Sequence, residues 1–201
     1  MTSVLDELRS SLSDDHVNEI SQRIGADPAR TRQAIDGALP LLVGALGKEA
    51  SDPQRAAGLR KAIEEDHDGS VVDDLGSYLS GGVAGRSTNG AGILQHVLGD
   101  RQQAAVQGLS ARSGLDMSAI SSLLPLLAPL VMGMIGKQQR GGGFSLDNLT
   151  EILGGDTKRA AGDSPDLGDL LGSVLGGGSG QEQGQGQGGI GDVLGSIFGK
   201  R

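Results

Sequence analysis

The sequence contains no cysteine, and this absence excludes disulfides, thiol nucleophiles and thiolate metal sites together. Aromatic residues are almost as scarce, since Tyr78, Phe144 and Phe198 are the only ones. Stacking on bases or sugars and aromatic cages around cations therefore have almost no side chains to use. The sequence also lacks a Gly-x-Ser-x-Gly elbow, a phosphate-binding loop and a dinucleotide fingerprint, so we expect no catalytic site and no cofactor.

Basic residues are outnumbered by acidic ones, 17 against 25, which gives a net charge of −8. This excess favours solubility and disfavours wholesale attraction to nucleic acid or anionic lipid, while leaving room for a local basic patch. The N-terminus lacks the basic region and apolar run of an export signal, because residues 1–9 read as an amphipathic helix start with early acids. We therefore expect a cytoplasmic protein.

An internal repeat is the strongest pattern that the chain does contain. Residues 17–48 reappear without a gap, 89 positions later, as residues 106–137. Self-similarity of this kind indicates a duplicated structural unit. Ten pairs are identical, and they are Val17/Val106, Ser21/Ser110, Arg23/Arg112, Gly25/Gly114, Asp27/Asp116, Pro40/Pro129, Leu41/Leu130, Gly44/Gly133, Gly47/Gly136 and Lys48/Lys137.

Residues that typically start or end helices occur throughout the chain. No stretch shows the sustained alternation of β-branched residues that is typical of strands. In the first copy Gly25 suits a helix end and Asp27 a helix start, and the second copy has the same pair. Pro40 and Pro129 each remove a backbone hydrogen bond and should kink equivalent helices. We predict an all-α, multi-helical domain over residues 1–140, in which two homologous helix-turn-helix repeats pack around kinked core helices.

Outside the repeats, the apolar spacing and capping residues predict several shorter helices. They are expected at residues 3–12, at 53–65, from Ser70 onward and at 93–98, with a loop at residues 81–92.

The last 61 residues hold 19 of the 36 glycines, so residues 141–201 are expected to form a flexible glycine-rich tail. Three short amphipathic segments lie within it, at residues 145–153, 165–176 and 190–199. The last two share one pattern 23 positions apart, and their apolar residues are Leu167, Leu170, Leu171 and Val174, then Ile190, Val193, Leu194, Ile197 and Phe198. Glycines cost about 1 kcal/mol each in a helix, so neither segment should be helical alone. We expect these segments to dock on the same chain, a second subunit or another protein.

Three further stretches give the chain a family resemblance. They are residues 66–75 (DHDGSVVDDL), residues 92–99 (GILQHVLG) and the leucine- and proline-rich residues 123–133, followed by the glycine-rich tail. In combination they resemble the YidB-like bacterial family, also called domain of unknown function 937. The resemblance covers most of residues 1–140 and implies a multi-helical bacterial protein with no established activity.

Residues 20–35 also resemble a DNA-binding helix-turn-helix. Arg30, Arg32 and Gln33 would lie on a helix able to enter a major groove. Three observations oppose this: Thr31 stands where an apolar residue is usual, the second copy offers only alanine and serine at these positions, and the domain is acidic. The preferred interpretation is therefore an αα unit of the core.

The densest polar cluster, residues 64–74, partly matches a calcium-binding loop. Its matching residues are Glu64, Asp66, Asp68 and Gly69. However, Leu75 stands where such a loop needs a bidentate glutamate. The plainer interpretation is a solvated turn whose acids cap the next helix. His67 in this cluster and His96 would form a metal or acid–base pair only if the fold brings them together.

Residues 117–136 contain no charge and reach the length that a bilayer requires. Prolines, glycines and serines interrupt the run, so a buried core helix is the preferred interpretation and membrane association the alternative. We therefore predict a non-catalytic assembly or protein-interaction module that binds other copies of itself or another protein. Nucleic-acid binding through residues 20–35 and membrane association are the two rival functions.

Overall fold

A computed structural model describes residues 3–82, 85–142 and 148–176, and all regular structure in these ranges is helical. The predicted all-α fold is therefore confirmed. The elements in order are α1 (Val4–Ser11), α2 (Asp14–Ile24), α3 (Pro28–Ser51), α4 (Pro53–Asp66), α5 (Ser70–Asp73), α6 (Leu75–Leu79), η1 (Arg86–Thr88), α7 (Gly90–Val97), η2 (Gly99–Arg101), α8 (Gln102–Ser113), α9 (Met117–Arg140), α10 (Leu149–Asp163) and α11 (Pro165–Leu175).

The two copies of the sequence repeat have the same local structure. In each, a helix ends at a glycine in the left-handed region, with a φ of 68° at both Gly25 and Gly114. An aspartate then caps the next helix, since Asp27 Oδ1 accepts from the Arg30 amide and Asp116 Oδ1 from the Ala119 amide. Both helices that follow, α3 and α9, have 24 residues and contain proline.

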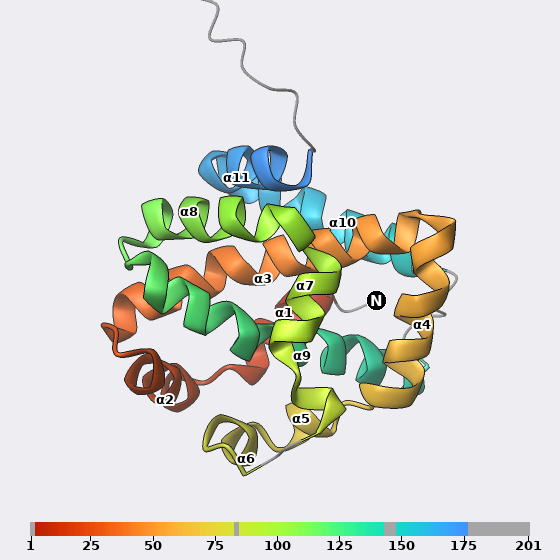
Figure 1. The fold of residues 1–201 in the computed structure, drawn as a ribbon, viewed down its shortest axis with the longest axis horizontal. Coiled ribbons are helices and arrows are strands. Elements are labelled where there is room, and N and C mark those ends of the chain that lie inside the picture. Colours follow the sequence, from red (N-terminus) through yellow and green to blue (C-terminus); the bar gives the residue numbers. More distant parts are fainter. Residues whose placement is uncertain (1–2, 83–84, 143–147, 177–201) are drawn as a thin grey trace, which may run out of the picture.

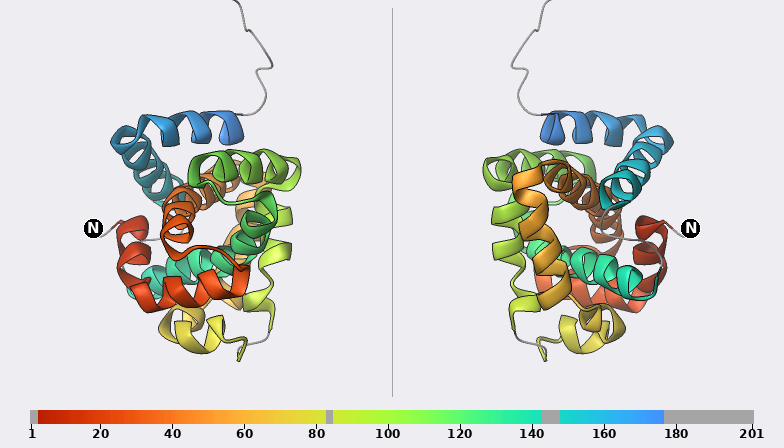
Figure 2. Two further views of the ribbon diagram at one scale, coloured as in Figure 1. Left: turned by 90° about the vertical axis from the view of Figure 1, so that its left-hand side faces the viewer. Right: turned by 90° about the vertical axis from the view of Figure 1, so that its right-hand side faces the viewer.

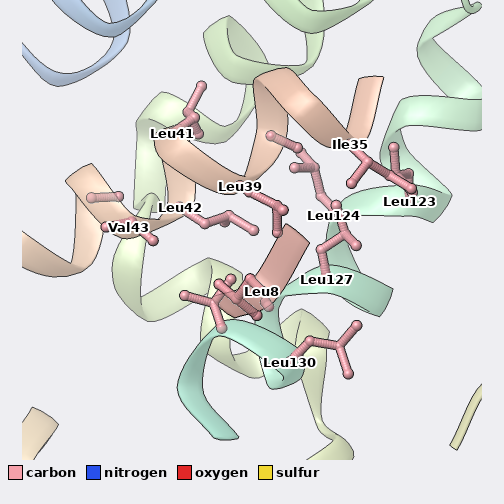
Figure 3. Packing of buried hydrophobic residues seen from close by; sticks show 14 of the residues in the cluster. Leu8, Ile35, Leu39, Leu41, Leu42, Val43, Leu123, Leu124, Leu127 and Leu130 are labelled. Carbon is pink, nitrogen blue, oxygen red and sulfur yellow. The ribbon is translucent and has the colours of Figure 1, made fainter. Parts of the chain in front are cut away.

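The core lies between α3 and α9, which cross the middle of the molecule (Figure 1). Figure 3 shows Leu39 and Leu42 of α3 beside Leu124 of α9, with Leu8 of α1 below them, and all four are at most 2% exposed. The smaller side chains of α3, such as Ala34 and Ala38, are fully buried too. Burying each large aliphatic side chain stabilises the fold by about 1.5–3 kcal/mol.

The packed unit extends past residue 140, where the sequence analysis places the start of the tail. The helices α10 and α11 lie across one side of α3 and α8, as both views in Figure 2 show. Their buried leucines and valines belong to the same apolar cluster as those of α3 and α9. Of the three tail segments, 165–176 thus forms a docked helix, 145–153 is described only from residue 148, and 190–199 lies outside the described residues.

A buried aspartate joins α10 to the N-terminal helix. Asp156 is 4% exposed, and its Oδ2 accepts from the backbone amides of Val4 at 2.8 Å and Leu5 at 3.4 Å. These amides belong to the first turn of α1, where helical N–H groups lack partners and the helix dipole favours a negative charge. The C-terminal helices are therefore tied to the start of the chain as well as to its core.

The loop expected at residues 81–92 is shorter than predicted, because α7 begins at Gly90. Asn89 caps this helix by accepting from the Gly92 amide at 3.1 Å. Gly90 lies against the backbone of Pro125 so closely that a Cβ there would overlap the Pro125 carbonyl. One of the glycines that suggest a loop, Gly90, thus allows a close contact between α7 and α9.

Candidate functional site

The identical glycines and lysine near the end of each repeat form a seat for another segment. In the first copy, a Cβ on Gly44 would lie 2.5 Å from Leu175 Cδ1, and one on Gly47 would lie 3.3 Å from Leu153 Cβ. The segments that cross these glycines are α10 and α11. Lys48 then donates from Nζ to the Leu175 carbonyl at 2.5 Å, at the C-terminal end of α11. We call Gly44, Gly47 and Lys48 the α3 seat.

The second copy uses the equivalent residues in the same way. A Cβ on Gly136 would overlap the carbonyl oxygen of His67, and one on Gly133 would lie 3.2 Å from Val72 Cγ2. Lys137 donates from Nζ to Asp73 Oδ1 at 2.5 Å. Here the crossing segment is residues 67–73, between α4 and α6. We call Gly133, Gly136 and Lys137 the α9 seat.

α11 is held along its length by the α3 seat and by α8. Its inward side chains are buried, and they are Leu167, Leu170, Leu171 and Val174. Gly108 of α8 makes room for Leu170, since a Cβ there would overlap Leu170 Cδ1. At the start of α11, Arg112 donates to Ser164 Oγ at 3.3 Å. Burial of four large apolar side chains explains why this glycine-containing segment is helical.

A cavity of about 450 Å³ lies between α4 and α7, and both candidate histidines line it. His67 comes from the end of α4 and His96 from α7, while Met132 of α9 contributes to the wall. The other lining residues are Gly58, Leu59, Ala62, Asp66, Asn89, Gly92, Ile93 and Val97. The fold therefore brings His67 and His96 to one site.

His67 is the buried imidazole of this cavity. It is 4% exposed, and its Nδ1 has no hydrogen-bond partner among the described residues. Burial lowers its pKa below the ordinary 6.5, and the nearby carboxylates of Asp66 and Asp68 only partly oppose this shift. A neutral imidazole can accept a hydrogen bond or act as a base. His96, by contrast, is exposed.

The acids of the calcium-like stretch have other partners. The pKa of the Asp68 carboxyl is lowered by a hydrogen bond from the Ser70 hydroxyl and by one from the Ser70 amide, which lies 3.0 Å from Oδ1. Its Oδ2 lies 3.6 Å from Arg140 Nη1. Glu64 is exposed on α4, and its carbonyl accepts from Arg140 Nη2 at 3.4 Å. No group of three metal-binding side chains occurs within the described ranges. The stretch behaves as the turn that covers the α9 seat.

The candidate nucleic-acid residues all lie at the start of α3. Arg32 bridges to α2 and the preceding turn, with Nη2 2.5 Å from Asp14 Oδ1 and Nη1 3.2 Å from the Leu12 carbonyl. Arg30 is exposed and donates to the Gly114 carbonyl at 3.2 Å, while Gln33 is exposed. Both arginines thus have intramolecular partners, and Arg30 links the two repeats.

The helix α9 is long and apolar enough to cross a membrane by length and composition. In its most apolar 18-residue window, however, 78% of residues are buried inside the protein. This burial is typical of a core helix.

Sequence reasoning missed the two seats, although their signal was present. Gly44, Gly47 and Lys48 are three of the residues that recur identically in the second copy. Glycine inside a helix costs stability, so its recurrence at two positions three residues apart indicates a close approach by another segment.

Comparison with known proteins agrees with the resemblance described above. The family model named "Bacterial protein of unknown function (DUF937)" matches residues 6–138, a stretch that includes both seats and ends before α10. Searches of curated proteins and of solved structures each found no match. A match over more than half of its length shows that the chain belongs to this DUF937 family of bacterial proteins of unknown function.

Proposed function

We propose that this protein is a non-catalytic assembly module, in which residues 190–199 of one copy occupy the α3 seat of another. The observation that carries the proposal is the match between residues 190–199 and the docked helix α11. The four positions that α11 buries and its partly buried Leu175 all have apolar counterparts 23 residues on. The pairs are Leu167/Ile190, Leu170/Val193, Leu171/Leu194, Val174/Ile197 and Leu175/Phe198.

The outward positions of the two segments support the same reading. Gly168, Asp169, Gly172 and Ser173 are each half-buried or exposed in α11, and the same four residue types recur at 191, 192, 195 and 196. A segment with the same inward and outward pattern fits the same groove. Each chain therefore offers two segments for one α3 seat.

Exchange between copies requires little net change in contacts. A seat that releases its own α11 and accepts residues 190–199 of a neighbour keeps a similar apolar face buried and leaves Lys48 free to donate to the new C-terminal carbonyl. Exchange of an equivalent element between protomers is a low-cost route to self-association. The α3 seat lies within the family match and both segments lie beyond it, so the segments act as additions to a shared domain.

Light scattering on the purified full chain at rising concentration tests the proposal. We expect its mass to rise above that of one chain, and we expect a variant ending at Gly176, which retains α11, to remain monomeric. Ile197→Asp places a charge on the inward face and should also give a monomer. Ser196→Asp, its matched control on the outward face, should assemble like the full chain.

Equal masses for the full chain, the truncated chain and Ile197→Asp would contradict assembly through residues 190–199. Circular dichroism of each variant checks that the helical domain is intact, so that a lost assembly is not mistaken for unfolding.

A further inference from the structure

We propose that the cavity between α4 and α7 binds a protonated amine with an apolar body, such as a short alkylamine. This site is independent of the α3 seat and of the assembly proposed above. Its volume of about 450 Å³ falls in the range of small-molecule sites. Such sites combine apolar walls with a few polar groups that fix orientation, and this cavity has both.

The apolar wall can hold a hydrocarbon chain. It is formed by Leu59 and Ala62 of α4, Ile93 and Val97 of α7, and Met132 of α9. Leu59, Val97 and Met132 are buried in the core, while Ala62 and Ile93 are half-buried. Each methylene group that moves from water into such a surface favours binding.

The polar side of the cavity favours a cation over an anion or a neutral head group. Asp66 contributes a carboxylate, and it is the last residue of α4, whose final turn contains no basic residue. A helix C-terminus carries a partial negative charge, so it adds to the attraction for a positive group. The guanidinium of Arg140 donates to the Glu64 carbonyl in the last turn of α4 and to Asp68, and it does not line the cavity. It offsets part of the charge of this helix end, so the Asp66 carboxylate is the main source of the preference for a cation.

His67 supplies the group that orients the amine. His67 is 4% exposed and lines the cavity. Its Nδ1 is enclosed by protein and out of contact with solvent, so a hydrogen bond to a molecule in the cavity would involve the other ring nitrogen, Nε2. Because burial holds the pKa of this imidazole below its ordinary value, the ring is neutral at pH 7 and can accept a hydrogen bond. An ammonium group has three donors, so it can donate hydrogen bonds to Asp66 and His67 at the same time.

A metal ion explains the same residues less well. Metal sites need several ligating side chains, and no group of three histidine, cysteine or acidic residues that could hold a metal ion occurs in the described part of the chain. The apolar wall would also be unused by a bare ion.

The test is a titration of the isotopically labelled full chain, followed by NMR, with three probes of equal length: hexylamine, hexanol and hexanoate. We expect hexylamine to shift the resonances of the cavity residues with the lowest Kd. Asp66→Asn should weaken hexylamine binding about tenfold or more, since it removes a charge-assisted hydrogen bond. Glu65→Gln, which removes the same charge from the next and exposed residue of α4, should leave the affinity unchanged.

Ile93→Trp provides a second variant in case Asp66→Asn fails to fold. A bulky ring at this half-buried position should fill the cavity and abolish the shifts, while the circular dichroism spectrum stays that of the parent. The proposal is overturned if hexanol or hexanoate binds as tightly as hexylamine, if no probe shifts the cavity resonances, or if neither variant weakens binding.

Discussion

The two halves of the molecule use the same glycine and lysine spacing to hold entirely different segments. The α3 seat holds helices from beyond the family match, whereas the α9 seat holds residues 67–73 from within it. In both halves the glycines remove side chains from the contact face and the lysine bonds to the segment that crosses it. A seat of this kind therefore specifies a close approach and leaves the identity of the occupant open.

The two seats differ in how closely they are approached. At Gly136 the neighbour is a backbone carbonyl, that of His67, which cannot rotate away. At the equivalent Gly47 an added Cβ would come no nearer than 3.3 Å, to Leu153 Cβ. At Gly44 the nearest neighbour is the end of the Leu175 side chain, which can adopt another rotamer. The α9 seat should thus be the rigid one and the α3 seat the adaptable one, as an exchange of segments requires.

The largest effect is expected from adding one methyl group to the α9 seat. Gly136→Ala should lower the free energy of unfolding by about 3 kcal/mol, because the new Cβ overlaps the His67 carbonyl and the backbone must move. Gly47→Ala is the equivalent change in the α3 seat. It should stay within about 1 kcal/mol of the parent, because alanine's better helix propensity offsets mild crowding at 3.3 Å from Leu153 Cβ.

Urea unfolding of the two variants measures this difference directly. Equal destabilisation by Gly136→Ala and Gly47→Ala would show that the two seats are equally tight, and the rigid–adaptable contrast would be lost.

A second prediction concerns the buried aspartate that joins α10 to the start of α1. Asp156→Ala leaves the Val4 and Leu5 amides without their acceptor, so it should cost about 2 kcal/mol of stability. Asp156→Asn keeps an acceptor oxygen but loses the charge at the helix start, and should cost about half as much. In thermal unfolding we expect the parent to have the highest Tm, Asp156→Asn an intermediate one and Asp156→Ala the lowest. A Tm for Asp156→Ala as high as the parent's would contradict the role of this aspartate.

The helices themselves could be predicted from the sequence because their signals are local. Asp27 with Pro28 opens α3, and Gly25 ends α2, as the capping and turn preferences of these residues predict. α11 could not be predicted in the same way, since its glycines weigh against a helix and its packing against α3, α8 and α10 stabilises it. The recurring glycines of the seats indicate a close contact with another segment, but they do not identify that segment.

The histidine cavity shows the same limit. Sequence reasoning singled out His67 and His96 separately, but their shared cavity depends on how α4 and α7 pack over α9. That packing rests on Gly90 and Gly136, two glycines whose neighbours lie far away in the chain. Nothing near either histidine in sequence specifies the other as its neighbour.

Lowering the pH should destabilise the contact at the α9 seat more than the contact at the α3 seat, because a buried histidine covers only the α9 seat. His67 has a folded-state pKa below the 6.5 of an unfolded histidine, so the unfolded chain binds the proton first as pH falls. Stability is therefore fully present above about pH 6.5 and declines as the pH drops toward the folded-state pKa. Urea midpoints at pH 7.5 and 5.5 should differ more for the parent than for His67→Gln.

The matched control is His96→Gln, which removes the other, exposed imidazole of the cavity. Hydrogen exchange at pH 5.5 should show where the protein is destabilised: we expect residues 67–73 to lose protection and α11 to keep it. An unchanged pH dependence in His67→Gln would show that this histidine does not control the acid response.

The smallest effects are expected from the two equivalent lysines. The side chains of Lys137 and Asp73 are 44% and 61% exposed, so their ion pair stabilises the fold by at most about 0.5–1 kcal/mol. Lys137→Ala should lower the urea midpoint by this small amount at low salt and by less at high salt, which screens the pair.

Lys48 donates instead to the last carbonyl of α11, so Lys48→Ala should loosen that helix without lowering global stability. Hydrogen exchange distinguishes the two outcomes, because faster exchange confined to α11 identifies Lys48 as the clamp of an exchangeable segment. An unchanged exchange rate of α11 in Lys48→Ala would instead show that its buried leucines and valine alone hold α11 in place.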